Sequence, residues 1–118
     1  MKRFVAVYLG SPEAHARSGW DKLDDTARKQ REAEGMKAWT QWAEKNANVI
    51  ADHGSPLGKT KRASREGIAD VKNNIAAYVV VEAESHEAAA KLFANHPHFS
   101  IFPGDSVEIM ECLPIPTR

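Results

Sequence analysis

Residues 75–83 have the sequence Ile75-Ala-Ala-Tyr-Val-Val-Val-Glu-Ala83, and this β-branched run decides the fold. Runs of this kind favour a strand. The alanine-rich segment 86–95, which follows Ser85, predicts a helix, and the alternation of apolar and polar residues over 105–113 predicts another strand. The last third of the chain is therefore expected to form a strand, a helix and a strand, in that order.

The first of these strands is apolar on both faces. Because side chains alternate, one face carries Ile75, Val79 and Val81 and the other carries Ala76, Tyr78 and Val80. One layer of helices covers only one face of a sheet, so the second face needs another covering layer. A chain of 118 residues is expected to obtain that layer from a second copy of itself, which predicts a homodimer.

The first half of the chain repeats this order of elements. A strand is predicted over 3–9, a helix from a cap at 24–26 to about 47, a short strand over 48–52 and an exposed hairpin over 59–67. Gly35 interrupts the helix pattern and indicates a kink, a close packing contact or the start of the ordered helix. Two such units predict an α+β fold, a ferredoxin-like βαββαβ sandwich, and two sandwiches packed sheet to sheet form a dimeric α/β barrel. One domain, 1–118, is expected.

The composition of the chain argues against several classes of protein. The chain has 16 basic and 16 acidic residues, so there is no net positive field to bind a nucleic acid or an anionic membrane. The single cysteine, Cys112, excludes an internal disulfide framework and suits a reducing compartment. The apolar run at the N-terminus is too short for a signal peptide core or a membrane span. We expect a soluble, cytoplasmic protein.

Several segments together indicate a family. They are Arg3-Phe-Val-Ala-Val-Tyr-Leu-Gly10, Trp39-Thr-Gln-Trp42, Gly54-Ser-Pro-Leu-Gly58, Val81-Glu-Ala-Glu-Ser-His-Glu-Ala-Ala89, His96-Pro-His-Phe99 and Phe102-Pro-Gly-Asp-Ser-Val-Glu-Ile-Met-Glu111. In these segments the chain resembles the YCII-related proteins, which are small bacterial dimeric α/β-barrel domains. The resemblance implies that fold over nearly the whole chain and implies no particular reaction.

One departure from that family concerns its Asp-Gly-Pro-Phe motif, which precedes the third strand. Here the corresponding segment is Ile68-Ala-Asp-Val-Lys-Asn-Asn74, and only Asp70 remains. The chain therefore resembles a subgroup without the motif, and whatever the motif does is not carried over. A histidine–aspartate pair has been suggested as a site in other members, and it is not assigned to positions here.

The segment Asp52-His-Gly-Ser-Pro-Leu-Gly-Lys-Thr60 is similar to a phosphate-binding loop but does not fit one. Gly54 and Gly58 enclose three residues where the motif needs four, and no helix is predicted directly after the loop. We therefore predict no nucleotide site and no cofactor.

The strongest local candidate for chemistry is His96-Pro-His98. Alternating histidines on an extended segment can offer two imidazoles to a metal, with Asp105 or Glu108 adding a carboxylate. Alternatively, Pro97 ends the preceding helix and the histidines cap its C-terminus, where a cationic imidazole is favourable. This helix-end interpretation is preferred to the metal site, and a proton-transfer or ligand contact is the third option.

Two other features have both a structural and a functional interpretation. His53 next to Asp52 becomes an oriented base if it lies in a turn, since neighbours on a strand point to opposite faces. Trp39 and Trp42 are typical core or interface anchors, and they can equally form the wall of a pocket.

These observations favour binding of a small organic molecule in a cavity of the dimer, with cofactor-free proton transfer as a further option. The predicted catalytic residues are His98, Asp105 and His53, and the predicted ligand-binding residues are Tyr78, Glu108, Met110, Phe4, Trp39 and Trp42. Of these, Tyr78, Glu108, Met110 and Phe4 are placed on the second sheet face, with His98 and Asp105 at its rim. The alternatives are a non-catalytic dimerisation or regulatory module and a small metalloprotein using His96 and His98.

Overall fold

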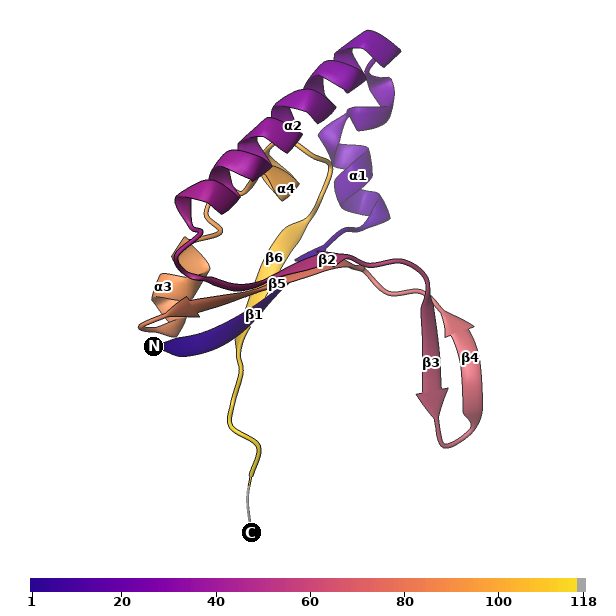
Figure 1. Ribbon diagram of the computed structural model, residues 1–118. Helices are drawn as coiled ribbons and strands as arrows, with labels where there is room; N and C mark the ends of the chain where they lie inside the picture. Colours follow the sequence, from indigo (N-terminus) through magenta and orange to yellow (C-terminus); the bar gives the residue numbers. More distant parts are fainter. Residues whose placement is uncertain (117–118) are drawn as a thin grey trace.

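The computed structural model describes residues 1–116 and consists of an antiparallel sheet with helices on one side (Figure 1). In chain order the elements are β1 (Lys2–Leu9), α1 (Pro12–Ser18), the 3₁₀ turn η1 (Trp20–Lys22), α2 (Asp25–Lys45), β2 (Ile50–Pro56), β3 (Thr60–Ser64), β4 (Gly67–Val71), β5 (Ile75–Ala83), α3 (His86–Lys91), α4 (Pro97–Ser100) and β6 (Ser106–Glu111). The main sheet has the order β2-β5-β1-β6, and every neighbouring pair is antiparallel. This is the ferredoxin-like α+β arrangement that the sequence predicts.

Helix α2 begins at the predicted cap. The Asp24 carboxylate accepts a hydrogen bond from the Ala27 N–H at 2.7 Å, and the helix then continues without a break to Lys45. Gly35 lies inside it because the Phe102 ring occupies the space that a Cβ would need. Of the three interpretations of Gly35, the close packing contact is therefore correct.

The helix predicted over 86–95 is shorter in the structure, and a second short helix follows it. Ser85 caps α3 as predicted, through the Ala88 N–H at 3.1 Å, but α3 ends at Lys91. Asn95 has a φ of 54°, and Pro97 then occupies the first turn of a new short helix, α4. Proline suits a helix N-terminus because it has no N–H to leave unpaired there. Pro97 thus starts a helix rather than ending one.

The helices cover one face of the sheet. The alternate residues Phe4, Ala6 and Tyr8 of β1 lie against them and are 0–2% exposed. Val79 and Val81 of β5 join this core, as do Ala89 and Phe93 from the α3 region. We call this side of the sheet the covered face.

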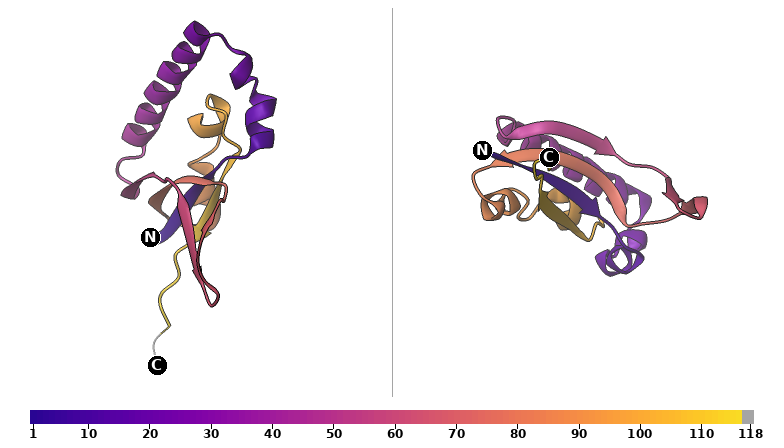
Figure 2. Two further views of the ribbon diagram at one scale, coloured as in Figure 1. Left: turned by 90° about the vertical axis from the view of Figure 1, so that its right-hand side faces the viewer. Right: turned by 90° about the horizontal axis from the view of Figure 1, so that it is seen from below.

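The opposite side of the sheet has no helix over it, and the right-hand view of Figure 2 looks onto it. The strand register aligns Val5 with Val80 on one neighbour and with Met110 on the other. In the same way, Val7 is aligned with Tyr78 and Glu108. We call this side the open face.

Phe4 was expected on the open face together with Tyr78, Glu108 and Met110, and this prediction is wrong. Phe4 pairs with Val81 and is fully buried under the helices. Alternation along a strand groups residues into two sets, but the sequence does not say which sets of neighbouring strands share a face.

Strand β2 is longer than the predicted segment 48–52 and has two register shifts, one on either side of Asp52. Gly54 lies at the second irregularity with a φ of 64°, and a Cβ there would collide with the Tyr78 carbonyl. The predicted hairpin forms as β3 and β4, a separate two-stranded sheet that points away from the helices (Figure 1). Within residues 1–116, no helix has both the length and the apolar character needed to cross a membrane.

Candidate functional site

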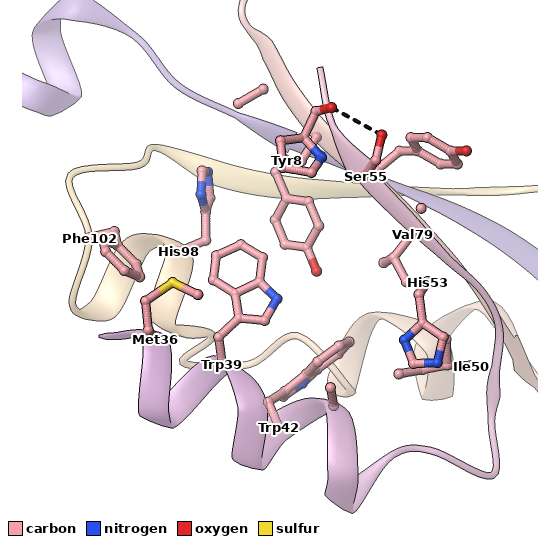
Figure 3. A pocket seen from close by; sticks show the side chains of 16 residues that line it. Tyr8, Met36, Trp39, Trp42, Ile50, His53, Ser55, Val79, His98 and Phe102 are labelled. Carbon is pink, nitrogen blue, oxygen red and sulfur yellow. Dashed lines mark hydrogen bonds between the residues drawn. The ribbon is translucent and has the colours of Figure 1, made fainter. Parts of the chain in front are cut away.

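An apolar cavity of about 460 Å³ lies between α2 and strands β2 and β5 (Figure 3). Its volume is within the range of small-molecule sites, roughly 300–1,000 Å³. Its 16 lining residues include no aspartate, glutamate, lysine or arginine. The large side chains at its wall are Tyr8, Met36, Trp39, Trp42 and Phe102, and Tyr78 borders the cavity from β5 although the strand register puts its side chain on the open face.

The local sequence explains how this wall is built. Met36, Trp39 and Ala43 are spaced by three and four residues, so one face of α2 presents them together to the cavity. Tyr8 reaches the same space from the covered face of β1. Helix and strand thus contribute aromatic rings from opposite sides, and the ring centroids of Tyr8 and Trp39 are 5.0 Å apart.

Tyr8 and His96 form a buried polar pair next to the cavity. The Tyr8 hydroxyl lies 3.3 Å from Nε2 of His96, and Nδ1 of His96 accepts the His98 N–H at 3.0 Å. His96 is 1% exposed, and burial lowers its pKa to about 4, with the neighbouring His98 adding to the effect. Burial also raises the pKa of Tyr8. Both groups are therefore neutral at pH 7.

His96 caps the start of α4 and does not cap the end of a preceding helix. The prediction that the histidines cap the C-terminus of the preceding helix in the cationic form is therefore wrong, because His96 caps the N-terminus of α4 and is neutral. Both ring nitrogens of His96 have partners, so neither is free to bind a metal. Among residues 1–116, no group of three or more His, Cys, Asp or Glu side chains is placed to hold a metal ion.

His98 lines the cavity and is fixed by the end of β1. Its Nε2 lies 2.7 Å from the Leu9 carbonyl oxygen, which can only accept, so Nε2 carries a proton. Gly104 packs against the imidazole so closely that a Cβ would overlap it. Burial lowers the pKa of His98, while the Leu9 hydrogen bond and the charge of Asp105 oppose that shift.

The second ring nitrogen of His98 is available to a ligand. Nδ1 of the neutral ring is an acceptor, and it has no hydrogen-bond partner in the described part of the chain. No buried side-chain nitrogen or oxygen of these residues lacks a partner, so Nδ1 is not sealed from solvent. Nδ1 of His98 is therefore an unpaired acceptor on a fixed ring and is in contact with solvent.

The other predicted catalytic residues are placed differently. His53 lines the cavity from β2 and is exposed, whereas the Asp52 carboxylate accepts the Gly54 N–H at 2.8 Å. Asp52 is therefore engaged by the backbone next to His53. Asp105 lies outside the cavity wall, 3.6 Å from the Arg17 guanidinium, and acts on His98 through its charge.

Of the predicted ligand-binding residues, Trp39, Trp42 and Tyr78 line the cavity. The Trp42 indole N–H donates to the Leu92 carbonyl at 2.7 Å, which fixes that ring. Glu108 and Met110 lie on the open face, away from this cavity. The structure thus brings His98, His53, Trp39 and Trp42 together, with Tyr78 at the border of the cavity on the other face of β5. It leaves Asp105, Glu108, Met110 and Phe4 outside.

Sequence reasoning missed Tyr8 as a site residue. The sequence feature that could have indicated Tyr8 is its hydroxyl group, which ends the otherwise apolar alternating set Phe4, Ala6 and Tyr8. A polar atom on an otherwise apolar strand face needs a buried partner, and His96 supplies it from 88 residues further along the chain. No local pattern connects two residues so far apart.

Comparison with known proteins identifies the fold and no family. No protein-family model and no curated protein matches the chain. Among solved structures, the chain is similar to 5-chloro-2-hydroxyhydroquinone dehydrochlorinase (TftG) from Burkholderia phenoliruptrix AC1100, in complex with 2,5-dihydroxybenzoquinone. The match has a TM-score of 0.53 and 15% sequence identity, and it covers 91% of this chain and 89% of that one.

Proposed function

We propose that the cavity binds a small, planar organic molecule and that His98 accepts a proton from it without a cofactor. The observation that carries the proposal is the free Nδ1 of a fixed, neutral imidazole at the wall of an apolar, aromatic cavity. A neutral imidazole at pH 7 is a competent general base.

The walls favour a ring-shaped ligand. Trp39, Trp42 and Tyr8 offer flat apolar surfaces, and stacking on such rings contributes beyond simple burial. The lining carries no full charge, so it favours a largely apolar molecule with a few polar atoms. The dehydrochlorinase of similar fold, whose structure holds a dihydroxybenzoquinone, makes hydroxylated aromatic compounds and quinones the first class to test.

His53 and Asp105 have supporting parts in this proposal. His53 lies at the cavity on an exposed part of β2, where solvent reaches it. Asp105 raises the pKa of His98 from a distance, which makes the ring a stronger base than burial alone would leave it. Asp105 is thus a positioning residue.

The test is a thermal-unfolding screen of the purified protein against phenols, hydroxyquinones and matched compounds without hydroxyl groups. A ligand of the native state raises the unfolding midpoint, by about 2.7 kcal/mol of stabilisation at a hundredfold excess over Kd. For each hit that carries an acidic C–H, incorporation of solvent deuterium at that carbon is followed by NMR with the wild type, with His98→Ala and with His15→Ala as control, since His15 is on α1 outside the cavity. Exchange should be lost only in His98→Ala. Unchanged exchange in that variant would exclude the proton-transfer role.

We also propose that the chain is a homodimer of the YCII-related type, packed through the open face. This face carries Val5, Val7, Val80 and Met110 in register, and Met110 is 44% exposed in the single chain. The β3–β4 hairpin projects on the same side, away from the helices (Figure 1). If the ligand screen is negative and the dimer is intact, the dimerisation-module alternative becomes the better assignment.

A further inference from the structure

We propose that the Tyr8 hydroxyl and the Trp39 indole N–H form a two-donor site for one oxygen atom of the ligand, and that His96 fixes Tyr8 as a donor. The inference rests on the proposed small-molecule function and specifies its ligand: a compound whose oxygen carries negative charge when His98 removes a proton. Phenols, enols and ketones with an acidic neighbouring C–H belong to this class.

The tautomer of His96 is fixed by its hydrogen bond to the backbone. Nδ1 of His96 lies 3.0 Å from the backbone nitrogen of His98, whose N–H can only donate. Nδ1 must therefore be unprotonated, and in a neutral ring the proton is on Nε2. Burial keeps the ring neutral, so this tautomer is the one present at pH 7.

The proton on Nε2 of His96 makes the Tyr8 hydroxyl a donor toward the cavity. Nε2 lies 3.3 Å from the Tyr8 oxygen, so the hydroxyl oxygen accepts from His96 and its own hydrogen remains to be donated. The rings around Tyr8 are those of Trp39, Phe93, His96 and His98, and no other hydrogen bond of its hydroxyl occurs within residues 1–116. In Figure 3 the hydroxyl points into the space bounded by Trp42, Val79 and His53.

Trp39 supplies a second donor next to the Tyr8 hydroxyl. The Trp39 indole nitrogen has no hydrogen-bond partner within residues 1–116, and no buried polar side-chain atom there is unpaired. The Trp39 N–H is therefore reached from outside, and Figure 3 shows it on the cavity side of the ring, facing the same space as the Tyr8 hydroxyl. Trp42, by contrast, has its N–H occupied by the Leu92 carbonyl.

Two neutral donors in an apolar wall are suited to a developing oxyanion. Fixed donors of this kind need no reorganisation as charge appears, and the surrounding low dielectric strengthens them. The cavity lining has no carboxylate that would repel the anion. The proton balance is complete: Nδ1 of His98 takes the proton, the electron pair stays on the ligand oxygen, and His98⁺ later returns the proton.

The experiment uses a pair of coloured probes, 4-nitrophenol and 4-nitroanisole, which share a ring but differ in the ionisable hydroxyl. For the wild type we expect the phenol to bind at least tenfold more tightly than the ether and to ionise at a lower pH when bound, seen as phenolate absorbance. Tyr8→Phe and Trp39→Phe each remove one donor and keep a ring, and each should weaken phenolate binding about ten- to hundredfold. Binding of the ether should change less than threefold in the same variants.

His96→Asn tests the positioning role. Its amide oxygen can still accept the His98 N–H, but the donor to Tyr8 is lost. The preference for the phenol should then fall while ether affinity is kept, which a merely structural role of His96 would not produce. If Tyr8→Phe does not fold by circular dichroism, Trp39→Phe carries the test alone.

The outcomes separate the two proposals. If neither probe binds the folded wild type, the small-molecule function fails, and the donor pair fails with it. If both probes bind equally well and the variants change neither, the cavity binds rings but the donor pair is wrong. Selective loss of the phenol supports it.

Discussion

The two faces of the main sheet carry the same kind of apolar residue but differ in how far these residues are buried. On the covered face Phe4, Ala6 and Tyr8 of β1 are buried beneath the helices, whereas on the open face Val5 and Val7 are only partly buried. The covered face also holds polar groups, since Tyr8, His96 and His98 lie beside it with hydrogen bonds. The two faces have a similar apolar composition, so composition does not distinguish them. The pKa values of titratable groups are shifted on the face that is buried within one chain.

The largest effect on stability is expected from removing a large side chain from the covered face. Phe4→Ala removes a fully buried ring that packs beside His86 and the core, and should lower the free energy of unfolding by about 3–5 kcal/mol. Urea unfolding at fixed protein concentration measures it. A loss below about 1 kcal/mol would mean that Phe4 is not part of the core and would remove the contrast between the faces.

The next effect is expected from charging the open face. Val5→Asp places a carboxylate between Val80 and Met110 and should weaken the proposed homodimer at least a hundredfold, because the charge must be desolvated at the interface. Sedimentation velocity should show a monomer with an unchanged far-ultraviolet circular dichroism spectrum. Ala33→Asp, at an exposed position on α2, is the control and should leave the sedimentation coefficient unchanged. A Val5→Asp protein that sediments like wild type would exclude this face as the interface.

The fold was predictable because it depends on repeated local patterns. The β-branched run over 75–83, the Ser85 cap and the cap at 24–26 are each signals within a short stretch of sequence, and all three are confirmed. Even so, periodicity alone did not show that Pro97 begins a separate helix.

The site was less predictable because it depends on contacts between distant segments. His98 was singled out from the His96-Pro-His98 spacing, and the structure places it in the cavity. Its partner, the Leu9 carbonyl, is 89 residues away, and Tyr8 is 88 residues from His96. Phe4 was misplaced for a related reason, since the face it occupies is decided by register with Val81.

Lowering the pH should reduce the free energy of unfolding through the buried histidines beside the covered face. The pKa of His96 is about 4 in the fold against about 6.5 when unfolded, so the unfolded chain binds more protons between these values. Stability from this group is complete above pH 6.5 and is lost as pH falls toward 4, by about 2 kcal/mol between pH 7.5 and pH 5. Burial lowers the pKa of His98 as well, so it acts in the same direction.

Urea unfolding of wild type and His96→Asn at both pH values checks this expectation. The variant should be less stable at pH 7.5 and should lose less stability on acidification. An equal pH dependence in both proteins would show that His96 already binds a proton in the fold, which would also undermine its role as donor to Tyr8.

The smallest effect is expected at the edge of the open face, and it depends on concentration. Met110 is 44% exposed in the single chain, so Met110→Ala removes little buried surface from a monomer and should cost below about 1 kcal/mol there. In a dimer packed through this face the same side chain would be covered, and the cost should rise toward the 2 kcal/mol or more of a buried methionine. Unfolding over a dilution series separates the two values, because only the dimer is stabilised by protein concentration. A cost that stays small at every concentration would place Met110 outside the interface, whereas a cost that grows with concentration would show that a second chain completes the burial that the helices give the other face.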